Sequence, residues 1–194
     1  MPRLVMPLLL AALALGQAAC TPTGVAVGAA ASAGVAASQE RGVKGAARDL
    51  RIRAEINRLW FEADTEMYAD VGLTIHDGRV LLTGDVPTAD ARAKAVRLAW
   101  QPDGVREIIN EVRIAPDGDF ADMARDKAIG AKLKSRLLMD GEVRSVNFEI
   151  AVSRRVVYLL GIARSAAEHD RVIAQARNIG GVRDVVDHIE VKDT

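Results

Sequence analysis

Cysteine and histidine are both scarce in this sequence of 194 residues. Cys20 is the only cysteine, so the chain has no partner for an intramolecular disulfide. The three histidines are His76, His169 and His188, and no two of them have the spacing of a zinc motif. We therefore expect no metal site and no disulfide framework.

The sequence also lacks an excess of charge and a nucleotide-binding loop. Its 26 basic residues balance 26 acidic ones, which does not indicate bulk attraction to nucleic acid. No glycine-rich loop is followed by a phosphate-binding lysine, and Gly180-Gly181 is better explained as the end of a helix. No cluster of nucleophilic or acid–base residues stands out, so we expect no catalytic residues and no cofactor.

The first residues have the pattern of an export signal. Arg3 precedes an almost wholly apolar run at residues 4–15, and small residues follow it. The run is shorter than the roughly 20 apolar residues that a membrane-spanning helix needs. We therefore predict a signal peptide at residues 1–19.

Cys20 directly follows this signal. Ala18-Ala19-Cys20 is similar to the end of a bacterial lipoprotein signal, which predicts lipidation of the cysteine sulfur. Ordinary cleavage of the signal, with a free thiol left behind, is the alternative. Residues 20–45 are mostly Gly, Ala, Ser, Thr and Val, which bury too little surface to offset the entropy of ordering. We predict that they form a lipidated tether.

The rest of the sequence contains one pattern twice, displaced by 77 residues. The matched pairs are Gly84 with Gly161, Gly104 with Gly181, Val105 with Val182, and Arg106 with Arg183. A fixed offset across several elements indicates duplication. Hydrophobic periodicity in each copy predicts a helix, two strands, a second helix and a third strand.

These copies predict an α+β fold with two small domains, at residues 46–115 and 119–194, joined by the turn-forming run at residues 115–119. Each αββαβ domain should place two helices on one face of a three-stranded mixed sheet. The other face of the sheet is left to solvent or a partner.

Several residues carry more local predictions. His76 is expected to be an ordinary residue of the first hairpin turn, and the corresponding turn before Val156 is predicted to be longer. Thr88 is a predicted helix N-cap, and Ser165 with Glu168 forms a predicted capping box.

Two further pairs of matched residues have predicted structural roles. Gly84 and Gly161 follow the second strand of each copy, where we predict a backbone conformation or a close approach that disfavours a side chain. Asn110 and Asp187 are matched polar residues that we interpret as marking a bulge or a sheet edge.

The order of apolar residues and glycines carries a family resemblance. The first copy has Leu73, Ile75, Val80, Leu82 and Gly84 before Gly104-Val105, and the second has Phe148, Ile150, Val157, Leu159 and Gly161 before Gly181-Val182. Each copy resembles a BON domain, a small module of bacterial envelope proteins, and the resemblance covers roughly residues 46–194. Two copies behind such a leader are similar to the dual-BON-domain lipoproteins of Gram-negative outer membranes.

The resemblance implies a function as well as a fold. It implies a non-enzymatic, lipid-anchored protein of the outer membrane that faces the periplasm and maintains envelope integrity. By analogy with the family, Thr21 after the cysteine favours sorting to the outer membrane.

The first helix of the second copy is unusually basic. Five cations, Arg125, Lys127, Lys132, Lys134 and Arg136, accompany a single acid, Asp126. Arg125, Lys132 and Arg136 should lie on one flank of the apolar stripe, with Lys127 and Lys134 on the other. Leu138 and Met139 extend the apolar surface. Such a helix can contact anionic phospholipid, so these seven residues form the predicted lipid-binding site.

Two alternatives stay open. The basic helix face can simply be solvated, with its leucines filling the core. The protein can instead be a periplasmic adaptor that binds an envelope assembly partner through a sheet edge or the face between its domains.

Overall fold

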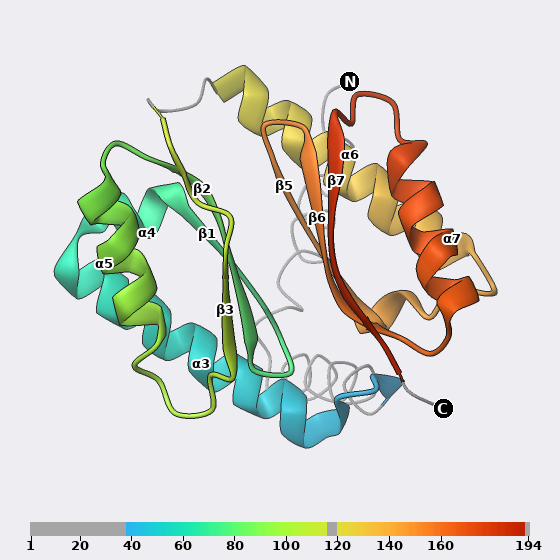
Figure 1. Ribbon diagram of the computed structural model, residues 1–194, viewed down its shortest axis with the longest axis horizontal. Helices are drawn as coiled ribbons and strands as arrows, with labels where there is room; N and C mark the ends of the chain where they lie inside the picture. Colours follow the sequence, from blue (N-terminus) through green and yellow to red (C-terminus); the bar gives the residue numbers. More distant parts are fainter. Residues whose placement is uncertain (1–37, 116–119, 193–194) are drawn as a thin grey trace, which may run out of the picture. The chain divides into compact units, whose positions relative to one another are not determined.

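The computed structural model describes residues 38–115 and 120–192 (Figure 1). The predicted export signal and Cys20 lie outside these residues. The first repeat contains α3 (Gly42–Ala63), α4 (Thr65–Asp70), β1 (Val71–His76), β2 (Arg79–Val86), α5 (Ala89–Ala99), β3 (Glu107–Asn110) and β4 (Arg113–Ile114). The second contains α6 (Phe120–Met139), a 3-10 turn (Ser145–Asn147), β5 (Phe148–Ser153), β6 (Val156–Ala163), α7 (Ala166–Arg177) and β7 (Asp184–Val191).

The α+β class and the predicted order of elements are confirmed. β1 pairs antiparallel with β2, and β2 pairs parallel with β3 and β4; the second sheet repeats this arrangement with β5, β6 and β7. The third strand of the first repeat is split after Asn110, whose Oδ1 accepts a hydrogen bond from the Val112 amide at 3.2 Å. Asp187 accepts from the Ile189 amide in the same way at 2.9 Å, although β7 continues there.

The start of α3 lies inside the segment predicted as tether. Residues 42–45 form its first turn, and the Arg41 side chain just before it is only 10% exposed. Arg41 donates to Asp49 at 2.6 Å in its own repeat and to Glu149 of the second repeat at 3.3 Å. The folded part of the chain therefore includes residues that composition alone assigned to the tether.

The hairpin turns of the two repeats have equal length, so the prediction of a longer second turn is wrong. Strand pairing ends at His76 with Arg79 in one repeat and at Ser153 with Val156 in the other. Arg154 and Arg155 have φ of 49° and 63°, as a two-residue type I′ turn requires. Arginine rarely adopts this conformation, so the sequence carries no turn signal there.

The helix caps agree with the sequence in part. The Thr88 hydroxyl accepts from the Ala91 amide at 3.1 Å, and the Ser165 hydroxyl accepts from the Glu168 amide at 3.2 Å. The reciprocal half of the capping box is replaced by a different contact, because the buried Glu168 carboxylate accepts from the amide of Arg164 at 2.7 Å.

The two sheets pack against each other through the faces that their helices leave uncovered. A shared cluster joins Leu81 and Ile109 of the first sheet to Val156, Tyr158 and Leu160 of the second. Leu81 and Tyr158 are matched residues of the duplication, so the interface is close to self-complementary, like that of a two-fold dimer. Figure 1 shows the sheets between the helices. The sheet faces are therefore buried within the chain.

Polar contacts between the repeats follow the same symmetry. His188 Nε2 lies 3.0 Å from Glu111 Oε1, and these two residues are themselves matched across the duplication, 77 positions apart. Arg79 Nη1 donates to the His188 carbonyl at 2.8 Å. Matched positions thus meet across the interface. The two domains together form one compact unit at residues 39–194.

Candidate functional site

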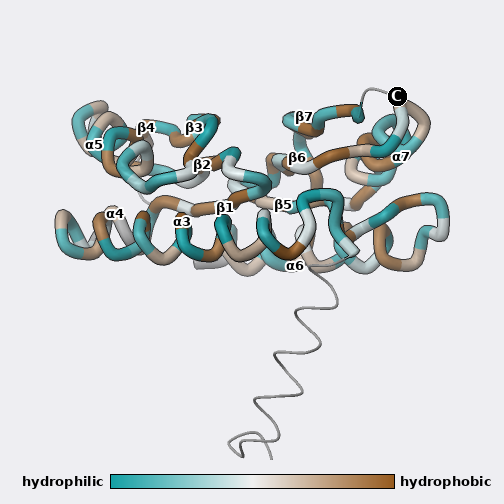
Figure 2. Tube along the Cα trace, turned by 90° about the horizontal axis from the view of Figure 1, so that it is seen from below, coloured by the Kyte–Doolittle hydropathy of each residue, from teal (hydrophilic) through white to brown (hydrophobic). Residues whose placement is uncertain are grey.

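α6 carries the predicted site residues, and its inner face is built as expected. Ile129, Leu133 and Leu137 are buried in the core of the second repeat. Figure 2 shows α3 and α6 along one side of the molecule, with α5 and α7 along the opposite side. The apolar stripe fixes the rotation of α6, so the cations of the helix are exposed on its other sides.

The five cations of α6 do not form one cluster. Lys127 and Lys134 line a groove beside β5, whereas the other three lie outside it. Arg136 Nη1 donates to the Asn178 carbonyl beyond α7 at 3.2 Å. Arg125 forms an exposed ion pair with Asp122 at 2.7 Å. The two predicted flanks are thus separate, and each has its own neighbours.

The last two turns of α6 combine charge with apolar exposure. Leu138 is 73% exposed and Met139 is 83% exposed. Both exposed fractions are larger than that of any other large apolar side chain in the described residues. Lys134 is exposed about one turn before Leu138, and Lys132 is exposed about two turns before Met139. This end of the helix therefore presents two apolar side chains with two cations beside them.

The matched helix of the first repeat differs in this respect. Phe61, at the position of Leu138, is 59% exposed, but the position of Met139 is occupied by Glu62. Arg58 pairs with Glu55 at 2.7 Å and with Glu62 at 2.6 Å. Its positive charge is neutralised locally, so α3 offers a weaker attraction to anions.

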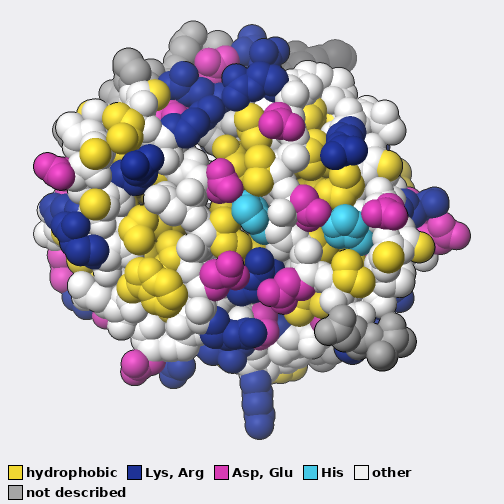
Figure 3. Space-filling model, viewed as in Figure 1, with side chains coloured by type: hydrophobic (Ala, Val, Ile, Leu, Met, Phe, Trp, Pro, Cys, Tyr) yellow, Lys and Arg dark blue, Asp and Glu magenta, His cyan; other side chains and the backbone are white. Residues whose placement is uncertain are grey.

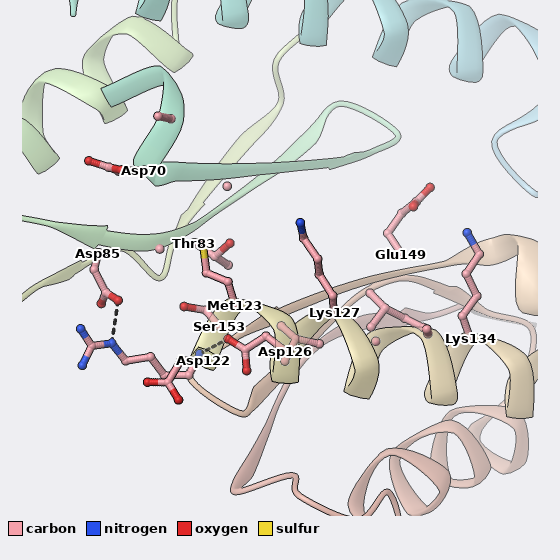
Figure 4. Close-up of a pocket in the computed structure, with 18 of the residues that line it drawn as sticks. Asp70, Thr83, Asp85, Asp122, Met123, Asp126, Lys127, Lys134, Glu149 and Ser153 are labelled. Carbon is pink, nitrogen blue, oxygen red and sulfur yellow. Dashed lines mark hydrogen bonds and ion pairs between the residues drawn. The ribbon is translucent and has the colours of Figure 1, made fainter. Parts of the chain in front are cut away.

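The groove beside α6 has a volume of about 740 Å³ (Figure 4). Its walls come from both repeats: α6 and β5 of the second, and residues around β1 and β2 of the first, including Gly72, Thr83 and Asp85. Figure 4 shows Lys127 and Lys134 extending from α6 into this space, with Glu149 on the β5 side. The groove thus exists only because the two repeats pack together.

Asp126 has a role that the sequence did not reveal. It is buried, and its carboxylate accepts from the turn amides of Arg154 at 2.6 Å and Arg155 at 2.8 Å. Asp49, its match in the first repeat, accepts from Asp77 at 2.7 Å and Gly78 at 2.8 Å. The sequence signal that could have predicted this role is the 77-residue offset between Asp49 and Asp126. Asp126 therefore has a structural role, because it holds the turn between β5 and β6.

His169 lies between α7 and β7. Its Nε2 is 2.6 Å from Asp187 and its Nδ1 is 3.0 Å from Asp170. Partial burial lowers the pKa of the ring, but the two carboxylates outweigh it and the pKa is raised. Figure 3 shows histidine side chains next to acidic ones on the face of the molecule that is seen in Figure 1. Among residues 38–115 and 120–192, no group of three or more His, Cys, Asp or Glu side chains is placed to hold a metal ion.

His76 is buried, which differs from the ordinary turn residue that we expected. Its ring is 0% exposed, and neither nitrogen has a hydrogen-bond partner in the described part of the protein. Burial lowers its pKa from 6.5 to about 4, and the charge of Arg41 acts in the same direction. Asp49 and Asp77 oppose this shift, while Arg79 adds to it. The ring is therefore neutral in the folded protein near neutral pH.

This burial predicts a loss of stability in mild acid. An unfolded chain protonates His76 near pH 6.5, but the folded chain does so only near pH 4. The free energy of unfolding is therefore highest above pH 6.5 and decreases by up to about 3 kcal/mol as the pH falls towards 4. We expect the His76→Phe variant to show a smaller loss over this range. Urea unfolding of both proteins at a series of pH values measures it, and identical pH profiles would contradict the assignment.

Comparison with known proteins gives the family. A family model described as the BON domain matches residues 48–116 and 125–193. The chain is 36% identical over 145 residues to an uncharacterised protein from the gshII 5′ region of Anaplasma centrale, covering 74% of this chain and 95% of that protein. It is 33% identical over 128 residues to the outer membrane lipoprotein DolP of Haemophilus influenzae, covering 64% of this chain and 65% of that one.

A third relative is the 21 kDa hemolysin of Actinobacillus pleuropneumoniae, which is 32% identical over 125 residues and covers 64% of each chain. The chain thus spans slightly less than two thirds of DolP and of the hemolysin. Among the described helices, none has the length and hydropathy needed to cross a bilayer. Both family matches coincide with the two repeats, and the chain therefore belongs to the BON-domain family, with two BON domains in tandem.

Proposed function

We propose that this protein is a non-enzymatic lipoprotein of the outer membrane, and that α6 of its second BON domain binds anionic phospholipid. The observation that carries the lipid contact is the end of α6, where Leu138 and Met139 are more than 70% exposed beside Lys132 and Lys134. Apolar side chains can enter the boundary of the bilayer while the lysines reach its phosphates. Each such cation contributes about 1 kcal/mol near an anionic surface.

The location rests on a relative and on the sequence. DolP is named as an outer membrane lipoprotein, which supports a similar place in the envelope for this chain, facing the periplasm. Acylation of Cys20, which lies outside the described residues, would supply the anchor. A single acyl chain binds membranes only marginally, so a second contact through α6 would strengthen attachment. The proposed role is the maintenance of envelope integrity.

The alternative role, a periplasmic adaptor, has fewer surfaces available than the sequence suggested. The faces between the domains are occupied by the shared core of the two sheets. Along β1, the carbonyls of Leu73 and Ile75 already accept hydrogen bonds from Arg53 and Arg41. An envelope partner would therefore need another edge, such as β7. These contacts favour the lipid-binding role.

A charge reversal on α6 tests this proposal. We expect the Lys132→Glu, Lys134→Glu double variant of residues 39–194 to lose at least about tenfold of its affinity for anionic vesicles, because two attractions become repulsions. Vesicle flotation measures the affinity. Binding of the unmodified protein should weaken with added salt, since a surface field is screened within about 8 Å at physiological ionic strength.

Exposed cations of α3 provide the matched control. Lys44→Glu with Arg51→Glu makes the same change in net charge on an exposed helix face of the first repeat. We expect this variant to retain most of the binding. Equal loss from both double variants would indicate a general charge effect, and undiminished binding by the α6 variant would exclude this helix as the lipid contact.

A further inference from the structure

The groove beside α6 contains two cations, Lys127 and Lys134, that have no partner among the described residues. Lys127 and Lys134 lie two helical turns apart, and both are exposed towards the groove (Figure 4). Neither forms a hydrogen bond or an ion pair with any other described residue. Lys134 is near enough to influence the pKa of Glu149, although no ion pair joins them. Two ammonium groups are therefore available to a ligand.

The acids that line the groove are already engaged. Asp85 pairs with Arg154 at 2.6 Å and with Arg113 at 3.2 Å. The other acids have the contacts described above: Asp122 with Arg125, Asp126 with the turn amides, and Glu149 with Arg41. Asp70 also has a partner. Because Asp85, Asp122 and Glu149 are paired with arginines, the two lysines give their part of the groove a local preference for an anion.

The groove is lined in part by small residues, and apolar surface follows it along α6. Gly72, Gly130 and Ala131 line it and carry little or no side chain. The row formed by Lys127, Ala131 and Lys134 continues along the same side of α6 to the exposed Leu138, because residues three and four apart are neighbours on a helix. Charge inside the groove is thus followed by apolar surface at its end, as an amphiphilic ligand requires.

We propose that this groove binds the headgroup of one anionic phospholipid, with Lys127 and Lys134 contacting its phosphodiester and Leu138 facing its acyl chains. This inference rests on the proposed lipid-binding function and gives it a bounded site in place of a diffuse surface. Gly72, Thr83 and Gly84 of the first repeat form the wall opposite α6. Binding therefore needs both BON domains, although the cations come only from the second.

A soluble lipid tests the site. Residues 39–194 are titrated with dihexanoylphosphatidylglycerol below its critical micelle concentration, while backbone amide shifts are followed by NMR. We expect saturation at one lipid per chain, with shifts on α6 and also at Gly72, Thr83 and Gly84. The Lys127→Gln, Lys134→Gln variant should raise the Kd at least about tenfold. The Lys44→Gln, Arg51→Gln variant, with the same charge change on α3, should stay within about twofold.

Each other outcome overturns the inference in a distinct way. Equally tight binding of inorganic phosphate, with the same shifts, would show a generic anion site. Shifts confined to the end of α6, or a lysine variant with unchanged Kd, would remove the groove from lipid binding. In either case, the proposed function would still hold if the unmodified protein floats with anionic vesicles. If the unmodified protein does not bind these vesicles, the proposed function itself is contradicted. Circular dichroism confirms that each variant is folded.

Discussion

Replacing Gly161 with valine is expected to destabilise residues 39–194 by at least about 3 kcal/mol, because no side chain fits at this position. Gly161 has φ of 154°, and a Cβ atom there would lie 2.1 Å from the Asn147 carbonyl oxygen. The obstructing atoms belong to the backbone, which cannot move without breaking the β5–β6 pairing. Gly84 has φ of 111° and would place a Cβ 2.2 Å from the Asp70 carbonyl oxygen. The predicted close approach at both glycines is therefore confirmed.

Urea unfolding measures this effect, and another glycine provides the control. At Gly130 an added Cβ would meet only Val152 Cγ2 at 3.5 Å, an ordinary contact. Gly130→Ala should therefore retain or raise stability, by up to about 1 kcal/mol, since alanine favours helix. A Gly161→Val protein as stable as Gly130→Ala would contradict the steric argument. Because the repeats share the core between their sheets, we also expect Gly161→Val to shift unfolding of both repeats together.

The Asp49→Ala variant is expected to lose about 3–5 kcal/mol, as when one partner of a buried ion pair is removed. Asp49 is 4% exposed, and its carboxylate accepts the turn amides of Asp77 and Gly78 as well as the Arg41 guanidinium. Removing the carboxylate leaves two amides and a nearly buried cation without this acceptor. The midpoint of thermal unfolding should fall by roughly 10 °C for a domain of this size.

The duplication supplies a comparison for this variant. Asp126 accepts the matched turn amides of Arg154 and Arg155. Among the described residues, no cation forms an ion pair with its carboxylate. Asp126→Ala should therefore cost less than Asp49→Ala, and Asp49→Asn should be intermediate because it keeps a neutral acceptor. A loss below about 0.5 kcal/mol for Asp49→Ala, typical of a surface change, would contradict the role of this acid.

Much of the fold could be predicted from the sequence because its signals are local. The period of apolar residues placed Ile129, Leu133 and Leu137 on the buried side of α6, as the structure confirms. Thr88 and Ser165 cap the helices that follow them, since an N-cap depends on only a few neighbouring residues. The repeated offset revealed two copies without any knowledge of how they pack. The lipid-binding role of the α6 residues stays a prediction.

Tertiary contacts between distant residues decided the rest. Arg154 and Arg155 adopt positive φ where Asp126, 28 and 29 positions earlier, accepts their amides. His76 is buried although its neighbours in the sequence suggested exposure; it pairs with Arg79, whose guanidinium donates to the His188 carbonyl of the second repeat. The first repeat packs beside only one flank of α6. Lys127 and Lys134 on that flank therefore line the groove, whereas the other cations of α6 lie outside it. Local sequence sets the periodicity of each element, but the packing of the two sheets determines which polar side chains remain free to bind.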